Sequence, residues 1–218
     1  MNYAALVTAI QDYCENTFAT ADMNTFIVQA EQRIYNAVQF PALRNISTTA
    51  LTANNRYLDC PSDFLAVVSF AVIDGTGAYT YLLNKDENFI REAYPTPTAT
   101  GVPKYYALFG PQASVPTELR FVLGPTPASA YSTELQYFYY PESITTVAGG
   151  HTWLGDNFDS VLLYGALVEA YTFMKGEQDM QQLYDTKFKE ALLLAKRLGD
   201  GMERGDMYRD GAPKQKVT

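Results

Sequence analysis

Hydrophobic positions are most concentrated between residues 152 and 198, where their spacing predicts two helices folded into a hairpin. Residues 158–174 carry apolar side chains on nearly every side of a helix, and such a helix is buried in a core or against neighbouring subunits. In residues 179–198 the apolar positions form one stripe, which includes Leu183, Tyr184 and Phe188, with charged residues opposite. We therefore expect the second helix to cover the first.

Capping residues predict where these two helices begin and end. Asp156 is expected to cap the first helix, because a carboxylate there accepts hydrogen bonds from the first backbone N–H groups. Gly176 is expected to end that helix in the left-handed conformation, and Asp179 with Gln182 has the spacing of a capping box for the second. The glycines that follow Leu198 predict that the second helix stops there.

Two shorter amphipathic patterns occupy the N-terminal end, over residues 3–17 and 20–40. Thr20 or Asp22 is expected to cap the second helix, and Pro41 to end it, because the residue before a proline is displaced from helical geometry. Helices this short are not stable alone in water. They are therefore expected to pack on the C-terminal hairpin.

Between residues 45 and 150 the spacing changes from helical to strand-like. The strand patterns lie at residues 46–51, 56–59, 66–73, 79–83, 119–123 and 131–140. Asn54 and Asn55 separate the first two patterns and predict a hairpin. The third pattern is unbroken and predicts a strand covered on both faces, whereas the fifth alternates and predicts one solvated face. Asn84 with Glu87 is expected to cap a short helix.

Together these patterns predict an α+β fold, in which a four-helix frame from the two ends of the chain carries an inserted antiparallel β-sandwich or barrel. The expected domains are a helical bundle (1–45 and 150–198), a β-domain (46–149) and a flexible C-terminal segment (199–218).

The composition is that of a folded globular protein, since 47% of the 218 residues are hydrophobic and 18% are charged. No apolar run is long enough to predict a membrane-spanning helix, and no basic-then-apolar start predicts a secretory signal. Cys14 and Cys60 are expected to be free, buried thiols, as in proteins of a reducing compartment.

The net charge of −8 is unevenly distributed along the chain. Residues 1–184 contain eight Lys or Arg and eighteen Asp or Glu, a balance of −10, and residues 185–218 contain eight and six, a balance of +2. Because nucleic-acid binding needs clustered positive charge, this acidic body argues against it.

Few residues are suited to catalysis or metal binding. His151 is the only histidine, and one histidine with two distant cysteines cannot assemble a tetrahedral zinc site. The acidic residues follow no calcium-loop spacing, and neither a P-loop nor a Gly-x-Ser-x-Gly motif occurs. Asp156 and Asp159 would make an acid–base pair, but their spacing favours helix capping. We therefore predict a protein that is not an enzyme, with no catalytic, cofactor or metal site.

Six phrases in the sequence occur in an order that resembles the head–tail adaptor proteins of short-tailed double-stranded DNA bacteriophages, the tubular-tail or gatekeeper type. They are EQRIYNAVQFPALR (31–44), YLDCPSDFLA (57–66), GVPKYYAL (101–108), LGPTP (123–127), YFYYPESI (137–144) and TWLGDNFDSVLLYGALVEAYTFMKGE (152–177). The resemblance covers residues 3–210. Cys60 is a departure, because an aliphatic residue is expected before Pro61.

This resemblance implies a ring, expected to be a dodecamer, that docks beneath the portal protein and extends the DNA channel. It also implies that the ring provides the attachment site for the next tail component, the nozzle protein. Genomic DNA would pass through the channel without specific binding, and no membrane is involved. The protein would assemble in the cytoplasm of the host bacterium and reside at the head–tail interface of the virion.

Two segments are predicted to bind these partners. The C-terminal segment combines anchor-type and positive side chains, and the resemblance implies that it reaches along the portal; its predicted portal-binding residues are Met202, Arg204, Met207, Tyr208, Arg209, Lys214 and Lys216. The loops 94–101 and 110–117 are longer than hairpins need, which indicates a partner-facing edge. Their predicted tail-protein-binding residues are Pro95, Thr96, Pro97, Pro111, Gln112 and Ser114.

Two alternatives from other classes remain open. The first is a receptor- or glycan-binding tail protein, for which Tyr137, Tyr139 and Tyr140 would form an aromatic platform. Tyrosine also suits strands and interfaces, so a core or subunit-interface role is favoured for the seventeen tyrosines of the chain. The second alternative is a small hydrolase that uses Asp156 or His151.

Overall fold

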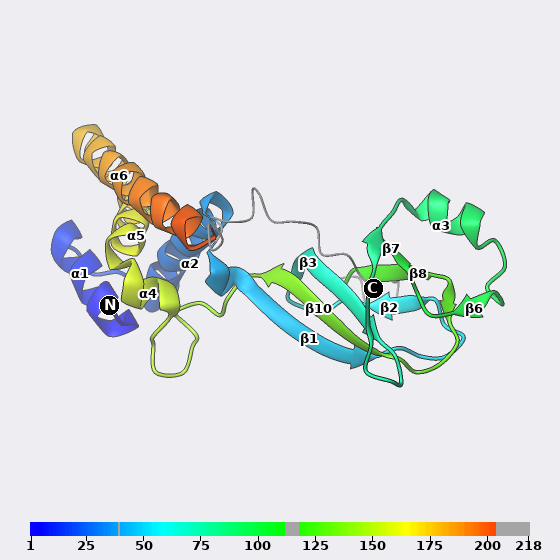
Figure 1. The fold of residues 1–218 in the computed structure, drawn as a ribbon. Coiled ribbons are helices and arrows are strands. Elements are labelled where there is room, and N and C mark those ends of the chain that lie inside the picture. The colour runs from blue at the N-terminus through cyan, green and yellow to red at the C-terminus, as the bar shows by residue number, and fades with distance from the viewer. Residues whose placement is uncertain (39, 112–117, 204–218) are drawn as a thin grey trace. The chain divides into compact units, whose positions relative to one another are not determined.

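The computed structural model describes residues 1–38, 40–111 and 118–203, and for residues 200–203 it describes the backbone alone. The chain divides into two compact units, one formed by Met1–Leu43 with Pro141–Thr218 and the other by Arg44–Tyr140. Figure 1 shows helices in the first unit, and sheets with the short helix α3 in the second. The predicted α+β fold is confirmed.

The helical unit is built around one central helix. Its elements are α1 (Tyr3–Cys14), α2 (Thr20–Ala37), a 3₁₀ turn (Pro41–Leu43), α4 (Trp153–Asn157), α5 (Asp159–Met174) and α6 (Gln178–Glu203). α5 contacts α1, α2, α4 and α6. Its buried residues are Val161, Leu162, Leu163, Gly165, Ala166, Leu167, Val168 and Ala170. The N-terminal helices therefore pack on the C-terminal hairpin, as predicted.

Gly165 is where α5 approaches its neighbours most closely on two sides. A Cβ at this position would lie 3.1 Å from Ala30 of α2 and 3.1 Å from the ring of Phe188 of α6. A larger side chain would push one of these helices away, so glycine allows both to pack directly against α5.

Glu169 is the acidic residue in the middle of this apolar helix, and its charge is paired. The carboxylate forms an ion pair with Arg33 of α2, and the Arg33 guanidinium lies 5.8 Å from the centre of the Phe188 ring of α6. A largely buried carboxylate without its partner is strongly unfavourable. Arg33 therefore joins α2, α5 and α6 through one side chain.

The predicted caps of α5 were wrong. Asp156 lies inside a separate short helix, α4, whose N-cap is Thr152, with its hydroxyl accepting a backbone N–H at 3.1 Å. α5 itself has Phe158 at its N-cap position, without a side-chain hydrogen bond. At the other end Lys175, not Gly176, adopts the left-handed conformation. Gly176 is required for a different reason, since a Cβ there would lie 2.7 Å from the ring of Tyr171.

The ends of α6 also differ from the prediction. The helix begins at Gln178, so Asp179 lies in its first turn, and it continues five residues beyond Leu198, to Glu203. A glycine in a helix interior costs only about 1 kcal/mol, and this penalty did not stop the helix at Gly199.

For two other helices, the predicted cap residues lie close to the observed ones but are not the same. α2 has Ala19 at its N-cap position, without a side-chain hydrogen bond, and it ends at Ala37, ahead of Pro41. α3 (Glu87–Ala93) is capped by Asp86, whose carboxylate accepts a backbone N–H, rather than by Asn84. Each error reflects several candidate cap residues close together in sequence.

The β unit consists mainly of two four-stranded sheets. Its strands are β1 (Arg44–Ala50), β2 (Tyr57–Asp59), β3 (Phe64–Ile73), β4 (Tyr79–Tyr81), β5 (Leu83–Asn84), β6 (Thr100–Gly101), β7 (Tyr105–Phe109), β8 (Arg120–Gly124), β9 (Thr126–Pro127) and β10 (Ser132–Tyr139). The strand orders are β1-β10-β3-β4 and β2-β8-β7-β5, and β6 pairs with β9. The first sheet is antiparallel throughout. The second is mixed, because β5 and β7 are parallel, and the separate β6–β9 pair is parallel as well.

An aromatic core fills the space between the two sheets. The rings of Phe70 (β3) and Phe121 (β8) have centroids 5.0 Å apart, and Tyr106 (β7) lies 5.6 Å from each. Leu123 and Leu135 complete the same cluster from β8 and β10. Because both sheets contribute, this core holds them face to face.

Three strand predictions were wrong in detail. Residues 46–51 and 56–59 form no hairpin, since β1 pairs with β10 and β2 with β8. β3 is not covered along its whole length, because Leu65 is 43% and Val68 is 38% exposed. β8 has no solvated face over residues 121–124, because α3 covers its outer side through Ile90 and Val122.

Replacement of Leu162 by alanine should destabilise the protein by about 2–5 kcal/mol, because this side chain is 1% exposed and its loss leaves a cavity. Leu194 of α6 is a matched control, since it is 64% exposed and its replacement by alanine should change stability by less than about 0.5 kcal/mol. Urea denaturation at low protein concentration measures both. Equal shifts for the two variants would contradict the central position of α5.

Candidate functional site

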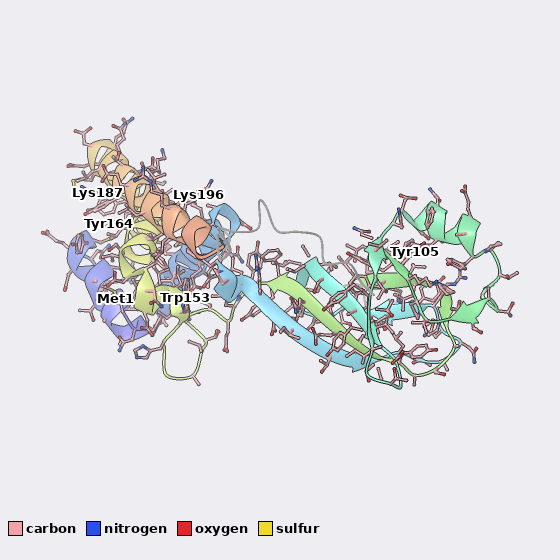
Figure 2. All side chains as sticks on the ribbon, viewed as in Figure 1. Met1, Tyr105, Trp153, Tyr164, Lys187 and Lys196 are labelled. Carbon is pink, nitrogen blue, oxygen red and sulfur yellow. The ribbon has the colours of Figure 1, made fainter. Side chains whose placement is uncertain are left out.

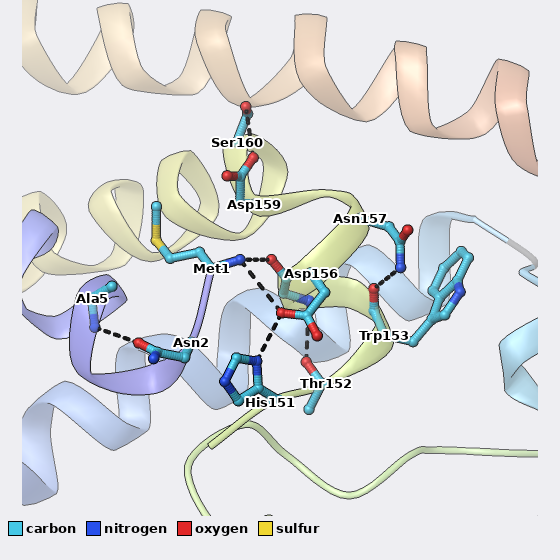
Figure 3. Close-up of polar contacts among 11 residues, drawn as sticks. Met1, Asn2, Ala5, His151, Thr152, Trp153, Asp156, Asn157, Asp159 and Ser160 are labelled. Atoms are coloured by element: carbon cyan, nitrogen blue, oxygen red, sulfur yellow. Dashed lines mark hydrogen bonds and ion pairs between the residues drawn. The ribbon is translucent and has the colours of Figure 1, made fainter. Parts of the chain in front are cut away.

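The polar cluster around α4 contains the histidine that the sequence singled out. His151 Nδ1 lies 3.0 Å from the Asp156 carboxylate, and the amino group of Met1 lies 3.6 Å from the same carboxylate. The Met1 amino group also donates to the carbonyl of Gly155. Figure 3 shows these groups converging on Asp156.

These polar contacts join the N-terminus and His151 to α4 at the protein surface, and they have the properties of structural contacts rather than of a catalytic centre. The hydrogen bond with His151 is the main cause that lowers the pKa of Asp156. The stabilisation from this hydrogen bond is therefore present above the pKa that Asp156 has in the unfolded chain. It is lost as the pH falls through the lower pKa of Asp156 in the folded protein. Asp159 has a different partner, the hydroxyl of Ser160 at 3.3 Å. The two aspartates thus form no acid–base pair (Figure 3).

Glu31 is a buried charged residue that the sequence analysis did not single out. It is 2% exposed, and its carboxylate accepts the backbone N–H of Ile144 at 3.0 Å and a hydrogen bond from Ser143. Burial raises the pKa of Glu31. The protein therefore loses stability as the pH rises from the pKa of Glu31 in the unfolded chain towards its higher pKa in the folded protein. Glu31 fastens the segment that follows the β unit to α2.

Both cysteines are free, and only Cys60 is fully buried, whereas Cys14 is half-buried. Burial raises the pKa of Cys14 to about 11. Burial, followed by the charges of Asp59 and Glu118, raises the pKa of Cys60 to about 12. Since the thiolate is the reactive form, neither sulfur is prepared for nucleophilic chemistry.

Within the described residues, no group of three or more His, Cys, Asp or Glu side chains is arranged to hold a metal ion. None of the described helices has the length and hydropathy needed to cross a membrane.

The predicted tail-protein-binding residues lie at two places in the β unit. Pro95, Thr96 and Pro97 are exposed in the loop that follows α3, and Pro111 is exposed after β7. Gln112 and Ser114 lie outside the described residues.

The predicted portal-binding residues lie almost entirely beyond the described part of the chain. Met202 belongs to the last turn of α6, and its side chain is not described. The others, Arg204, Met207, Tyr208, Arg209, Lys214 and Lys216, follow Glu203 and lie outside the described residues.

Of the three tyrosines suggested as a sugar platform, only Tyr140 is exposed, at 38%, and Tyr139 is half-buried. Tyr137 is 2% exposed, and its hydroxyl donates to Asp63 at 2.9 Å, so it belongs to the core and not to a sugar platform. Tyr79 and Tyr81 of β4 are instead exposed, and their rings stack at 6.3 Å. Tyr79 and Tyr81 are two residues apart on a short edge strand, which places both rings on the same face. This spacing is the sequence signal that could have identified them.

A second exposed apolar feature runs along α6. Leu183, Leu193, Leu194 and Leu198 are between 46% and 64% exposed. Only Leu183 had been assigned to the stripe that covers α5, and the structure corrects that assignment. Figure 2 shows Lys187 and Lys196 along the same helix.

Comparison with known proteins gives one family. The family model described as SU10 adaptor protein matches residues 1–213 of the chain. No curated protein matches the chain.

The two thiols provide a direct test of the local environment. At pH 8 a thiol with a pKa of about 11 is roughly one thousandth ionised. Iodoacetamide should therefore label Cys14 on the order of a hundredfold, and Cys60 on the order of a thousandfold, more slowly in the folded protein than in urea. Mass spectrometry of quenched samples gives both rates. Labelling of Cys14 at the unfolded rate would show that its thiol is not shielded.

Proposed function

This chain belongs to the SU10 adaptor protein family, whose members are phage adaptor proteins, and from this we propose that it forms the head–tail adaptor ring of a short-tailed double-stranded DNA phage. The observation that carries the proposal is the family match, because it spans nearly the whole chain rather than one unit. The same match makes the protein a component of the virion and a structural part that contacts other phage proteins.

The two-unit architecture supports a part that joins more than one partner. Each unit has its own core, and each exposes large apolar side chains. On the β unit these include Ile46, Tyr79, Tyr81, Leu83, Leu108 and Phe109, and on the helical unit Phe173 and the leucines of α6. The leucines of α6 form a strip along one helix, and an exposed apolar strip of this kind marks a protein contact.

The acidic charge supports a channel through which DNA moves. Residues 1–184 carry a balance of −10, from eight basic and eighteen acidic residues. A wall of the same sign as DNA repels the phosphates and prevents sticking. We therefore propose that the genome passes through the ring, a dodecamer in this proposal, without specific contacts.

The two ends of the adaptor are proposed to bind different phage proteins. The segment after α6 would dock on the portal, because it combines methionine, tyrosine and arginine side chains that anchor interfaces. The loops that contain Pro95–Pro97 and Pro111 would face the nozzle protein, because their exposed prolines stiffen surface loops without packing them.

Native mass spectrometry of the purified protein, alone and mixed with the portal protein of the same phage, tests the proposal. The expected result is a closed ring on the portal, with twelve adaptors for each portal ring. A chain that remains monomeric alone and leaves the portal unbound would overturn it.

A chain that ends at Glu203 should fold normally and fail to bind the portal, since the proposed docking segment is absent. In the full-length chain, Tyr208→Ala with Arg209→Ala should weaken portal binding at least about thirtyfold, as anchor residues contribute about 2 kcal/mol or more. Surface-immobilised portal rings give the affinity. Unchanged binding by the truncated chain would assign portal docking to another surface.

A Gly-Ser bridge in place of residues 110–117 should spare portal docking and impair attachment of the nozzle protein. The urea midpoint should stay unchanged, because the replaced segment lies between the end of β7 and the start of β8 and a loop's length has a small effect on stability. Co-sedimentation with each partner separates the two activities. Loss of portal binding with retained nozzle binding would reverse the orientation of the adaptor.

A further inference from the structure

Two faces of the helical unit differ in shape and charge in a complementary way. The first is the leucine ridge of α6, defined by Leu183, Leu193, Leu194 and Leu198. The second is the outer face of α1, defined by Ala4, Ala5, Thr8, Asp12 and Glu15. Both α1 and α6 pack on α5, and Figure 1 shows them on different sides of it.

The leucine ridge is a continuous strip of one helix. Leu183 and Leu194 are eleven residues apart, close to three turns, and Leu198 follows one turn later. All four leucines are at least 46% exposed, although α6 already buries Tyr184, Phe188 and Ala195 on its other side. Lys187, Glu190 and Arg197 lie on the same side as the ridge and are exposed, and Lys187 forms an ion pair with Glu190 at 3.5 Å.

The outer face of α1 is small and acidic. Ala4, Thr8 and Asp12 follow one another at four-residue spacing, and all are exposed. At the end of this face, Gln11, Asp12, Glu15, Asn16 and Thr17 line an open hollow of about 520 Å³. Residues 1–32 contain four acidic residues and neither lysine nor arginine, so no basic side chain of α1 offsets this charge.

The complementarity favours a second copy of this chain as the occupant. Leucine side chains project into space that alanine and threonine leave open, which allows two helices to pack closely. Lys187 is already paired with Glu190, but Arg197 beside the ridge matches Asp12 and Glu15 beside the small face, so encounter is electrostatically favourable. A contact between two different faces of the same chain is heterologous, and such contacts generate rings when the rotation closes.

We propose that the leucine ridge of α6 packs against the outer face of α1 of the next subunit, and that this contact forms the lateral interface of the ring. The inference rests on the proposed function, because it assigns the surface through which the adaptor ring closes. The acidic hollow then receives a basic side chain that flanks the partner's ridge.

Two single substitutions test this contact, each blocking one face. Leu194→Glu places a negative charge on the ridge, and Thr8→Glu places a bulky negative charge at the centre of the α1 face. Gln32→Glu on α2 is the matched control, since Gln32 is exposed and belongs to neither face. Native mass spectrometry is carried out on each variant alone, on the mixture, and on portal rings incubated with each.

Wild type and Gln32→Glu should form rings, and each blocked variant alone should be monomeric. Their mixture should yield a one-to-one dimer and nothing larger, because only the intact α1 face of one variant and the intact ridge of the other remain. Assembly of Thr8→Glu alone into dimers would indicate a ridge-to-ridge contact and overturn the proposal. Rings formed by both variants would overturn it while leaving the adaptor function standing.

Two further outcomes separate the remaining explanations. A lower free energy of unfolding for Leu194→Glu at low protein concentration, with ring formation unchanged, would show that another part of the same chain covers the ridge, which overturns the proposal. A wild type that is monomeric alone and on portal rings would contradict the adaptor function itself, and the assigned interface with it.

Discussion

The structure depends on the burial of α5, a helix with apolar side chains on nearly every side. No single neighbour can cover such a helix, so α1 and α2 from before the β unit and α4 and α6 from after it all contact it. Gly165 lets α2 and α6 approach directly, and the Arg33–Glu169 pair fixes the rotation of α5 between them. The inserted β unit is tolerated because the segments before and after it both belong to the helical unit.

The sequence predicted the helices well because their signal is local. A period of 3.6 residues requires no knowledge of the rest of the chain, and the burial of Leu162 and Val168 followed from it. The caps were less predictable, because Thr152, Asp156 and Asp159 all suit a helix start and only the structure shows that α4 intervenes. Strand pairing was unpredictable for a different reason, since β1 pairs with β10, about ninety residues away, and no local pattern encodes that distance.

The candidate surfaces show the same limit. Sequence spacing can place Tyr137 and Tyr81 on strands, but it cannot tell which side of a sheet another sheet will cover. Tyr137 lies in the core and Tyr81 is 64% exposed. On α6 the leucines around residue 194 continue the apolar composition of the buried stripe, and only their angular position separates the two faces. Burial depends on the partner layer, which the residues of one element do not specify.

The order of synthesis has a consequence for a helical unit made from both ends of the chain. The ribosome releases α1 and α2 first, yet their packing partner α5 emerges only after the complete β unit of Arg44–Tyr140. The β unit can therefore fold during translation, whereas the helical unit closes after release, through contacts more than a hundred residues apart. An incomplete chain that lacks α5 therefore leaves the apolar faces of α1 and α2 without the helix on which they pack.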